Sequence, residues 1–412
     1  MATKKFEMDF AGKKLTVEIG KLAQQANASC TLRYGDTVVL STAVMSKEPR
    51  QGIDFFPLMV EVNEKMYAAG KIKGSRFIKR EGRPTDTAVL DGRMVDRGIR
   101  PLFNQELKNE VQVTVTALSY DEENPTNIVG ITAAALVLGL SDIPWRGPLV
   151  GIAVGRVNGE LVLNPTIKQM EQSDLNLIFS VSGDKIMMVD ADAKETKEED
   201  VFKAFEFGVK AAQPLLDFVK KVCQEAGKEK QDENVLIELA NSSGEVKMEE
   251  KKAVFEEAKK FFASALDKYL FNQPKGTKRE RKEIAKVLLK DFTSQLKEQG
   301  KHEEIIDYVS DNFEKYLEAE VTKAILEREQ RVDGRKLTDI RPLDSEVSLL
   351  PRVHGSALFN RGETQVLSVV TLGAPGDAQI LDEMTKDDTK KSYMHFYNCP
   401  PYSFGEAGPF RS

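Results

Sequence analysis

Alternating apolar and polar positions mark several short strands in the first half of the chain. Side chains at successive strand positions point to opposite faces of a sheet, so a period of two is typical of strands with one buried face. The segments are also rich in Val, Ile, Thr and Phe, which favour strands. The predicted strands are Leu15–Ile19, Thr37–Val44, Val111–Ala117, Leu149–Val157 and Leu175–Val181.

Two helices interrupt these strands. One runs from Thr85 to about Arg100, and the other runs through the apolar stretch Ile128–Leu140. Asn124 is the candidate N-cap of the second helix, with Pro125 in its first turn. Strands and helices in this order predict an α/β or α+β sheet covered by helices.

The segment from Ala191 to Gln330 has a different pattern. Apolar residues recur three and four positions apart with charges between them, as in 249–262 and 305–317, which is the period of amphipathic helices. Of its 140 residues, 26 are basic and 31 acidic, with the two signs interspersed. We therefore predict a bundle of helices with solvated faces, and favour this interpretation over RNA-binding or membrane-binding helices.

A repeat connects the two ends of the chain. Residues 28–44 match residues 355–371 at a constant offset of 327, and both copies place a glycine where a hairpin turn needs a positive φ. A second match, Met66–Gly70 with Phe404–Gly408, has an offset of 338 and implies 11 extra residues in the second copy. We interpret the repeat as a duplicated domain. Its second copy reaches only its early strands before Ser412, so we expect the chain to be cut short within a domain.

The composition indicates in which cellular compartment the protein resides. Hydrophobic residues make up 41% of the chain, and 59 basic against 65 acidic side chains give a net charge of −6. The three separated cysteines, Cys30, Cys223 and Cys399, exclude a disulfide framework and a zinc ribbon and indicate a reducing compartment. No apolar run approaches the roughly 18 residues of a membrane span, and the start does not read as a signal peptide. We expect a cytoplasmic protein with no membrane partner.

Sequence motifs exclude several kinds of chemistry. The chain has no G-x-x-x-x-G-K-[ST], G-x-G-x-x-G, H-E-x-x-H or G-x-S-x-G motif. No histidine has a partner at metal-ligand spacing, and we interpret His354 as structural. Asp190 and Asp192 share a strand face and could offer two carboxylates to Mg²⁺. A solvated strand end is the favoured interpretation, because the sequence fixes no third acidic group nearby, and we assign no metal ligand.

One cluster of basic residues stands out from the acidic whole. The basic segment, Lys65–Arg100, holds ten Lys or Arg against four Asp or Glu, which gives it a net charge of +6. Gly70, Gly74, Gly82 and Pro84 indicate a loop in its first part, and backbone N–H groups of such a loop can face an anion.

The basic segment has the residue types that bind single-stranded nucleic acid. Phe77 lies close to Lys79 and Arg80, so that bases would meet a ring while phosphates meet charge. Three arginines on the predicted helix are four and three positions apart and share one face, where guanidinium groups can bind phosphate oxygens. Intrahelical ion pairs and an ordinary solvated surface remain alternatives. The candidate binding residues are Phe77, Lys79, Arg80, Arg83, Arg93, Arg97 and Arg100.

These motifs, together with two others, closely resemble those of the bacterial polynucleotide phosphorylases. The resemblance covers essentially the whole chain and is carried by Phe77–Pro84, Asp96–Phe103, Arg331–Leu343 and His354–Gln365. It implies an α+β fold with two ribonuclease PH-like cores joined by an all-helical domain. We expect the first core over residues 1–230, the all-helical domain over 231–325 and the beginning of the second core over 326–412.

The resemblance also implies an activity. The family degrades RNA from the 3′ end by phosphorolysis, with inorganic phosphate as co-substrate and nucleophile, and releases nucleoside diphosphates. Arginines and Mg²⁺ would neutralise charge at the transferring phosphorus, so no nucleophilic side chain is needed. Family members form homotrimeric rings with single-stranded RNA in the central channel and can join RNA-degradation complexes; no DNA partner is expected. Lys79, Arg80 and Arg83 would guard the channel, and the three helix arginines would contact RNA or support the site.

Two departures from the family pattern matter. Ile78 stands where the family usually has a second phenylalanine, so one stacking ring is lost while the charge is kept. The family's phosphate-binding serines and Mg²⁺-binding aspartates, and its KH and OB-fold modules, fall beyond Ser412. The resemblance therefore assigns no catalytic residue to this chain. We expect a phosphorolytic 3′-to-5′ exoribonuclease whose catalytic half is missing here, and the alternative is a noncatalytic RNA-binding or scaffold fragment.

Overall fold

The computed structural model describes most of the chain. The described residues are 3–50, 53, 55–72, 79–80, 82–241, 246–271, 278–385, 389–405 and 407–409. Among the helices of these residues, none is both long and apolar enough to cross a membrane.

A six-stranded sheet forms from the first 120 residues. Its strands follow the order β1-β2-β3-β4-β6-β5, in which β5 is parallel to β6 and all other neighbours are antiparallel. Alternate apolar positions are buried, as at Val111, Val113 and Val115 of β6, which confirms the period of two. The strands are β1 (Lys4–Phe10), β2 (Lys13–Ile19), β3 (Ala28–Tyr34), β4 (Thr37–Pro49), β5 (Leu58–Asn63) and β6 (Asn109–Ser119).

A second, four-stranded antiparallel sheet has the order β10-β9-β7-β8. Helices pack on both faces of its strand β7, α2 through Gly151 and α4 through Ile152 and Val154. Both faces of β7 are therefore apolar, and Val150 to Val154 are all buried. The elements are β7 (Val150–Val157), β8 (Glu160–Leu163), β9 (Leu175–Ser182), β10 (Lys185–Ala193), α2 (Thr126–Leu140) and α4 (Glu198–Ala226).

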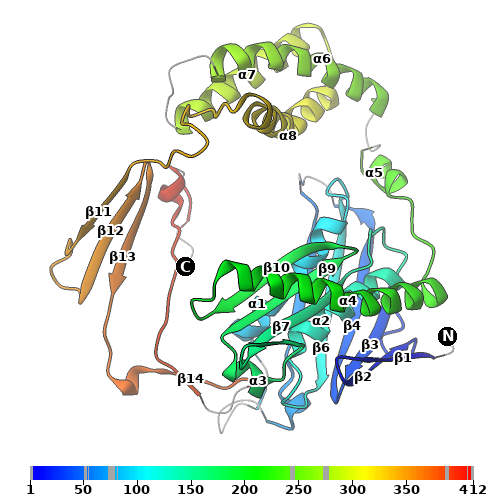
Figure 1. The fold of residues 1–412 in the computed structure, drawn as a ribbon. Coiled ribbons are helices and arrows are strands. Elements are labelled where there is room, and N and C mark those ends of the chain that lie inside the picture. The colour runs from blue at the N-terminus through cyan, green and yellow to red at the C-terminus, as the bar shows by residue number, and fades with distance from the viewer. Residues whose placement is uncertain are drawn as a thin grey trace.

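Helix α2 lies between the two sheets (Figure 1). It contacts β3, β4 and β6 of the first sheet and β7 of the second. Residues 133–138 are fully buried, as expected of a helix that is apolar all round. Strands and helices thus form layers around one hydrophobic core, and the predicted α+β class is confirmed.

The expected N-cap of α2 is wrong. The helix begins at Thr126 after Pro125, which makes no side-chain cap. The side chain of Asn124 instead donates to Asp121 and accepts a hydrogen bond from Lys13 Nζ at 2.7 Å. These contacts, a local one to Asp121 and a long-range one to Lys13, hold the Asn124 amide away from the helix.

Helix α1 (Asp86–Ile99) carries the second half of the basic segment. The Thr85 side chain caps it by accepting a hydrogen bond from Ala88 N at 3.0 Å. The helix contacts β5, β10 and α2, so it spans the edges of both sheets. The short turn η1 (Met66–Ala69) lies at the start of the basic segment, and η2 (Arg100–Leu102) begins at its last residue. Helix α3 (Ile167–Gln172) lies between β8 and β9 in sequence.

The helices after α4 include a group with a hydrophobic core of its own. Phe262 is fully buried there, with its ring centroid 4.6 Å from that of Phe313 and 5.2 Å from that of Phe292. Helices α6, α7 and α8 stand apart from the sheets (Figure 1) and form the helical part of the predicted bundle. The prediction is wrong for α4, which lies in the same segment but packs on the second sheet. Leu236 of α5 packs instead into the core of the sheets, and the bounds at 230 and 325 stay predictions. The elements are α5 (Glu233–Asn241), α6 (Met248–Leu266), the π-helical turn η3 (Asp267–Phe271), α7 (Lys278–Glu298) and α8 (Glu303–Arg328).

The hairpin of β12 and β13 repeats that of β3 and β4. Each strand begins 327 residues after its counterpart, and the two hairpins pair in the same register. The turn glycines Gly35 and Gly362 have φ values of 63° and 60°. The offset of 327 is therefore confirmed. The three-stranded sheet consists of β11 (Leu343–Val347), β12 (Gly355–Arg361) and β13 (Thr364–Val370).

The expected offset of 338 for the second match is wrong. Turn η1 ends at Gly70 and turn η5 (Pro401–Phe404) ends at Gly405, and both glycines are left-handed, with φ values of 69° and 71°. The structural offset is 335, so the second copy carries 8 extra residues rather than 11. Glycines at both 405 and 408 allowed the sequence match to settle on the wrong one.

The second copy exposes side chains that the first copy buries. Val366 and Val370 of β13 are about half exposed, whereas their counterparts Val39 and Ala43 of β4 are fully buried in the core that contains α2. Beyond β13, turn η4 (Pro375–Asp377) leads to a hairpin of β14 (Gln379–Leu381) and β15 (Thr389–Lys391).

Candidate nucleic-acid interface

The loop part of the basic segment is described only at its ends. Residues 73–78 and residue 81 lie outside the described residues, and Phe77 is one of them. Lys79, Arg80 and Arg83 are exposed. They lie directly before the first turn of α1, where Thr85 also donates a 2.6 Å hydrogen bond to Glu64 at the end of β5.

The helix part of the basic segment presents two exposed arginines, Arg93 and Arg97. Arg97 lies 3.5 Å from Asp190 of β10, and both side chains are at least half exposed. An exposed ion pair of this kind contributes little to stability. The Arg97 guanidinium can therefore leave the Asp190 carboxylate and bind a phosphate with little loss of stability.

Arg100 has a different environment. Its guanidinium forms a fork with Asp96, with bonds of 2.9 and 2.7 Å, and it donates to the carbonyl oxygens of Phe56 and Leu58. These contacts tie the end of α1 to the start of β5. Of the two roles expected for the helix arginines, support is the one that fits Arg100.

Sequence reasoning missed Asp91, which lies on the buried face of α1. Its exposed fraction is 5%. Burial, together with the nearby carboxylates of Glu64 and Asp190, raises the pKa of Asp91 to about 7, although a hydrogen bond from Asn127 lowers it. Helical spacing could have indicated this burial. Asp91 is three residues after Ala88 and four before Val95, so it shares their face of the helix, and both of those residues are buried in the core.

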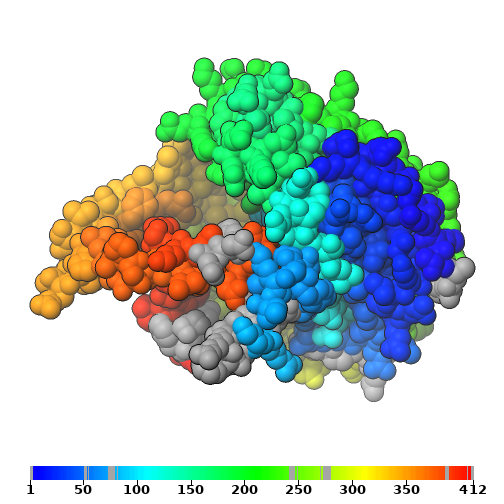
Figure 2. Space-filling model, turned by 90° about the horizontal axis from the view of Figure 1, so that it is seen from below, coloured from blue at the N-terminus to red at the C-terminus, as the bar shows by residue number. Residues whose placement is uncertain are grey.

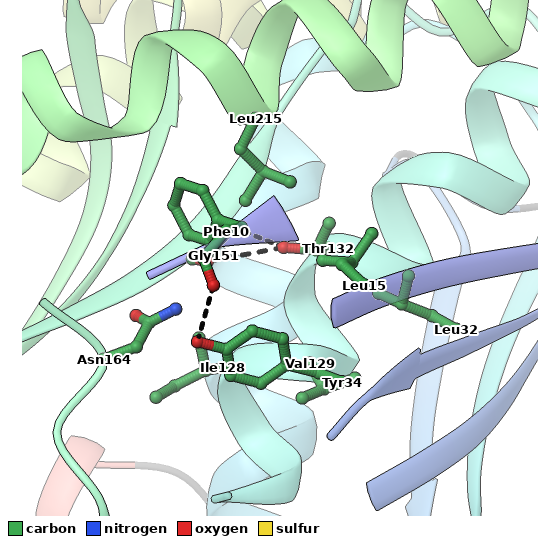
Figure 3. A pocket seen from close by; sticks show the side chains of 10 residues that line it. All are labelled: Phe10, Leu15, Leu32, Tyr34, Ile128, Val129, Thr132, Gly151, Asn164 and Leu215. Atoms are coloured by element: carbon green, nitrogen blue, oxygen red, sulfur yellow. Dashed lines mark hydrogen bonds between the residues drawn. The ribbon is translucent and has the colours of Figure 1, made fainter. Parts of the chain in front are cut away.

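A cavity in the first core offers no room for a substrate (Figure 3). Its volume is about 20 Å³, and it is lined mainly by apolar side chains, including Leu15, Val129 and Leu215. Tyr34 closes one side and donates a hydrogen bond to the Phe10 carbonyl oxygen at 3.3 Å. Such a volume holds about one water molecule.

The described residues contain no group of three or more His, Cys, Asp or Glu placed to hold a metal ion. Asp190 and Asp192 of β10 are both exposed. Asp190 faces Arg97. The pair therefore does not fit a divalent cation site in this part of the protein.

Two family models match the chain. The 3′ exoribonuclease family, domain 1, matches residues 11–144 and again residues 339–411, and domain 2 of the same family matches residues 147–211. The chain belongs to the 3′ exoribonuclease family. The double match to domain 1 agrees with the internal repeat, and the region between the matches contains helices α5 to α8.

Full-length relatives in this family are similar over the whole chain. Polyribonucleotide nucleotidyltransferase of Heliobacterium modesticaldum is 45% identical over 98% of this chain and 55% of its own length. That of Syntrophomonas wolfei is 45% identical over 100% of this chain and 56% of its own length. The crystal structure of rice Rrp46 is 16% identical, with a TM-score of 0.43, over 51% of this chain and 94% of that one. The chain thus spans about half the length of the relatives it matches.

Proposed function

We propose that this chain forms part of an enzyme that degrades single-stranded RNA from the 3′ end by phosphorolysis. The observation that carries the proposal is the 45% identity, over essentially the whole chain, to proteins named polyribonucleotide nucleotidyltransferase. The exposed cations of the basic segment support it, because a protein with a net charge of −6 needs a local basic surface to hold RNA.

The proposed reaction brings two anions together. An oxygen of inorganic phosphate attacks the phosphorus of the terminal phosphodiester, the bond from this phosphorus to the preceding 3′ oxygen breaks, and a nucleoside diphosphate leaves. Cationic side chains along the RNA lower the repulsion between the reactants. We assign this role to Lys79, Arg80, Arg83, Arg93 and Arg97, with Phe77 as a stacking residue and Arg100 as support.

Further features of the enzyme are part of the same proposal. Mg²⁺ would supply charge neutralisation at the phosphorus in the complete enzyme, but the described residues do not fit it, and we assign it no step. A homotrimer that works with other RNA-degradation proteins follows from the resemblance. The free thiols of Cys30, Cys223 and Cys399 support a cytoplasmic location.

An assay of product formation tests the proposal. The purified chain is incubated with poly(A) and Mg²⁺, with and without inorganic phosphate, and ADP is measured. ADP that appears only with phosphate supports phosphorolysis by this chain. Release of AMP in the absence of phosphate contradicts it, because water would then be the nucleophile.

A noncatalytic RNA-binding fragment is the second candidate. The observation that favours it is the lack, among the described residues, of a group that could hold a catalytic cation. This candidate predicts salt-sensitive binding of poly(A) without ADP release. Failure to bind poly(A) even at low salt contradicts both candidates.

A further inference from the structure

The hairpin of β14 and β15 lies against the first core, far from its neighbours in sequence. We call the described residues 379–385 and 389–391 the clamp hairpin. Figure 2 shows the orange segment that holds it meeting the light-blue segment that holds the start of α1. Hydrogen bonds across this contact join residues 313 and 296 positions apart.

Met384 is the apolar anchor of the contact. Its exposed fraction is 1%, although most of the large apolar side chains around it in sequence are exposed, Ile380 at 68% and Leu372 at 71%. It packs with Met66 and Ala68 of η1, with Ala117 of β6 and with Tyr120. A flexible methionine fills an irregular gap of this kind well. Because Met384 is buried while most large apolar side chains near it in sequence are exposed, it occupies a specific binding position on the first core.

Polar contacts surround the anchor on two sides. Lys71 Nζ donates to the Met384 carbonyl oxygen at 3.1 Å, and Thr87 Oγ1 donates to Glu383 Oε2 at 3.3 Å. Lys391 Nζ lies 3.6 Å from Asp86 Oδ2. The Glu383 residue is only 6% exposed, so its bond to Thr87 satisfies a largely buried carboxylate.

The contacts fall at two places in the chain, one before and one after three of the proposed RNA-binding residues. Met66 and Lys71 precede Lys79, Arg80 and Arg83 in the chain, and Asp86 and Thr87 follow them. The clamp hairpin therefore holds the backbone on both sides of these three cations. Fixing both ends reduces the conformational entropy that the cations lose when they bind a ligand.

We propose that the clamp hairpin, through Met384 and Glu383, positions the basic segment for RNA binding. The inference rests on the proposed function, because it names a determinant of the same RNA-binding surface. Met384 and Glu383 contact the first core and are not among the residues proposed to bind RNA, so they are positioning residues. The second copy of the duplicated domain thereby acts on the RNA-binding surface of the first.

Two measurements on the full chain test the clamp. In the first, hydrogen–deuterium exchange is followed for the amides of residues 65–72 and 85–90. In the second, the affinity for a fluorescent oligo(A) is measured by anisotropy. The variants are Met384→Ser, which puts a polar group in the apolar seat, and Met384→Leu, which keeps an apolar side chain of similar size. Ile380→Ser, on the same hairpin but exposed, is the matched control.

Met384→Ser is expected to speed exchange at both places by at least about tenfold and to weaken oligo(A) binding by a similar factor. Met384→Leu and Ile380→Ser are expected to change both quantities less than about threefold. Should Met384→Ser fail to fold, Thr87→Val serves instead, because it removes the donor to Glu383 and conserves shape. It is expected to speed exchange in residues 85–90 and to weaken binding.

The outcomes separate the clamp from the proposed function. Unchanged exchange in Met384→Ser overturns the clamp, and so does faster exchange with unchanged oligo(A) affinity. If the wild-type chain shows no oligo(A) binding, the proposed function fails, and the positioning role fails with it. Faster exchange in Met384→Ser would then leave only a structural contact. If Lys79→Ala with Arg80→Ala weakens binding and Met384→Ser does not, only the clamp fails.

Discussion

The basic side chains of the basic segment have different partners in the structure, although their sequence surroundings are similar. Arg97 meets one exposed carboxylate, whereas Arg100 uses its guanidinium on Asp96 and two carbonyl oxygens. A basic side chain is available to RNA only when its donors are not already committed inside the protein. Lys79 and Arg80 are both exposed and precede the helix, and they are the first residues to test.

Replacing Lys79 and Arg80 together by alanine is expected to weaken binding of single-stranded RNA roughly tenfold at moderate salt. The slope of log K against log salt should become shallower by about 0.7 for each phosphate that the variant no longer neutralises. Binding of labelled oligo(A) measured at several salt concentrations gives both values. Lys282→Ala with Lys290→Ala, two exposed lysines of α7, is the control for loss of charge alone. Equal affinities in the two double variants would contradict the assignment.

Asp91 makes the stability of the first core depend on pH. Its pKa is about 7 in the folded protein, against about 4 in an unfolded chain, so folding favours the protonated form. The stability that this preference contributes is complete below about pH 4 and is lost as the pH rises through 7. Between those values the wild-type protein becomes less stable relative to a variant with a neutral side chain.

At pH 8 the Asp91→Asn variant is therefore expected to be more stable than the wild type, by on the order of 1–3 kcal/mol in free energy of unfolding. Its unfolding temperature should be correspondingly higher. The difference should shrink towards pH 5. Thermal unfolding followed by circular dichroism across this range measures it, with the exposed Asp192→Asn as control. A difference between variant and wild type that stays constant from pH 5 to pH 8 would show that Asp91 does not titrate in this window.

At the level of elements, the first core depends on how closely α2 approaches β7. A Cβ built on Gly151 would lie 2.6 Å from Ile131 Cβ, which is closer than two carbon atoms tolerate. Glycine at this position allows the helix and the strand to touch through their backbones. The close approach also lets Thr132 Oγ1 accept a hydrogen bond from Gly151 N at 2.9 Å.

Gly151→Ala is expected to destabilise the protein by about 1–3 kcal/mol, because the new methyl group overpacks the contact between α2 and β7. Urea unfolding followed by circular dichroism measures the change. Gly376→Ala is the matched control, since a Cβ there meets nothing within 4 Å. If both variants lose the same stability, the effect belongs to glycine replacement in general and not to this contact.

The elements themselves could largely be predicted from the sequence, because each follows a local pattern. The strands, the buried α2, the charged bundle and the hairpin repeat at an offset of 327 all rest on periodicity or direct similarity. The offset of 338 failed because two glycines lie close together, at 405 and 408. Most other errors concern contacts between distant parts of the chain. Lys13 draws Asn124 away from α2, Arg100 is committed to β5, and Met384 is buried by residues some 300 positions away. No local pattern encodes such contacts.

The whole molecule contains separate hydrophobic cores. The sheets enclose one, and helices α6 to α8 enclose another around Phe262. Regions with separate cores unfold with limited dependence on each other. This separation supports the proposed division of the chain into a first core and an all-helical domain, and substitutions in each core can test it.

Phe262→Ala is expected to destabilise the helical core by about 3–5 kcal/mol and to leave the sheets intact. Differential scanning calorimetry should then show one transition at a lower temperature and another unchanged. Val113→Ala, in the buried strand β6, should move the other transition. A single transition that both variants shift together would show that the two regions unfold as one unit.

The length of chain between Met384 and its seat also sets an order of events during synthesis. The last strand of the two large sheets ends at Ala193, and Met384, whose carbonyl oxygen accepts a hydrogen bond from Lys71, lies 191 residues further along the chain. At about 5–20 residues per second, a ribosome needs roughly 10–40 s to cover that interval. Each new molecule therefore spends roughly 10–40 s with its proposed RNA-binding surface formed but not yet in contact with the clamp hairpin. A partner or an RNA that arrives during translation meets that earlier form.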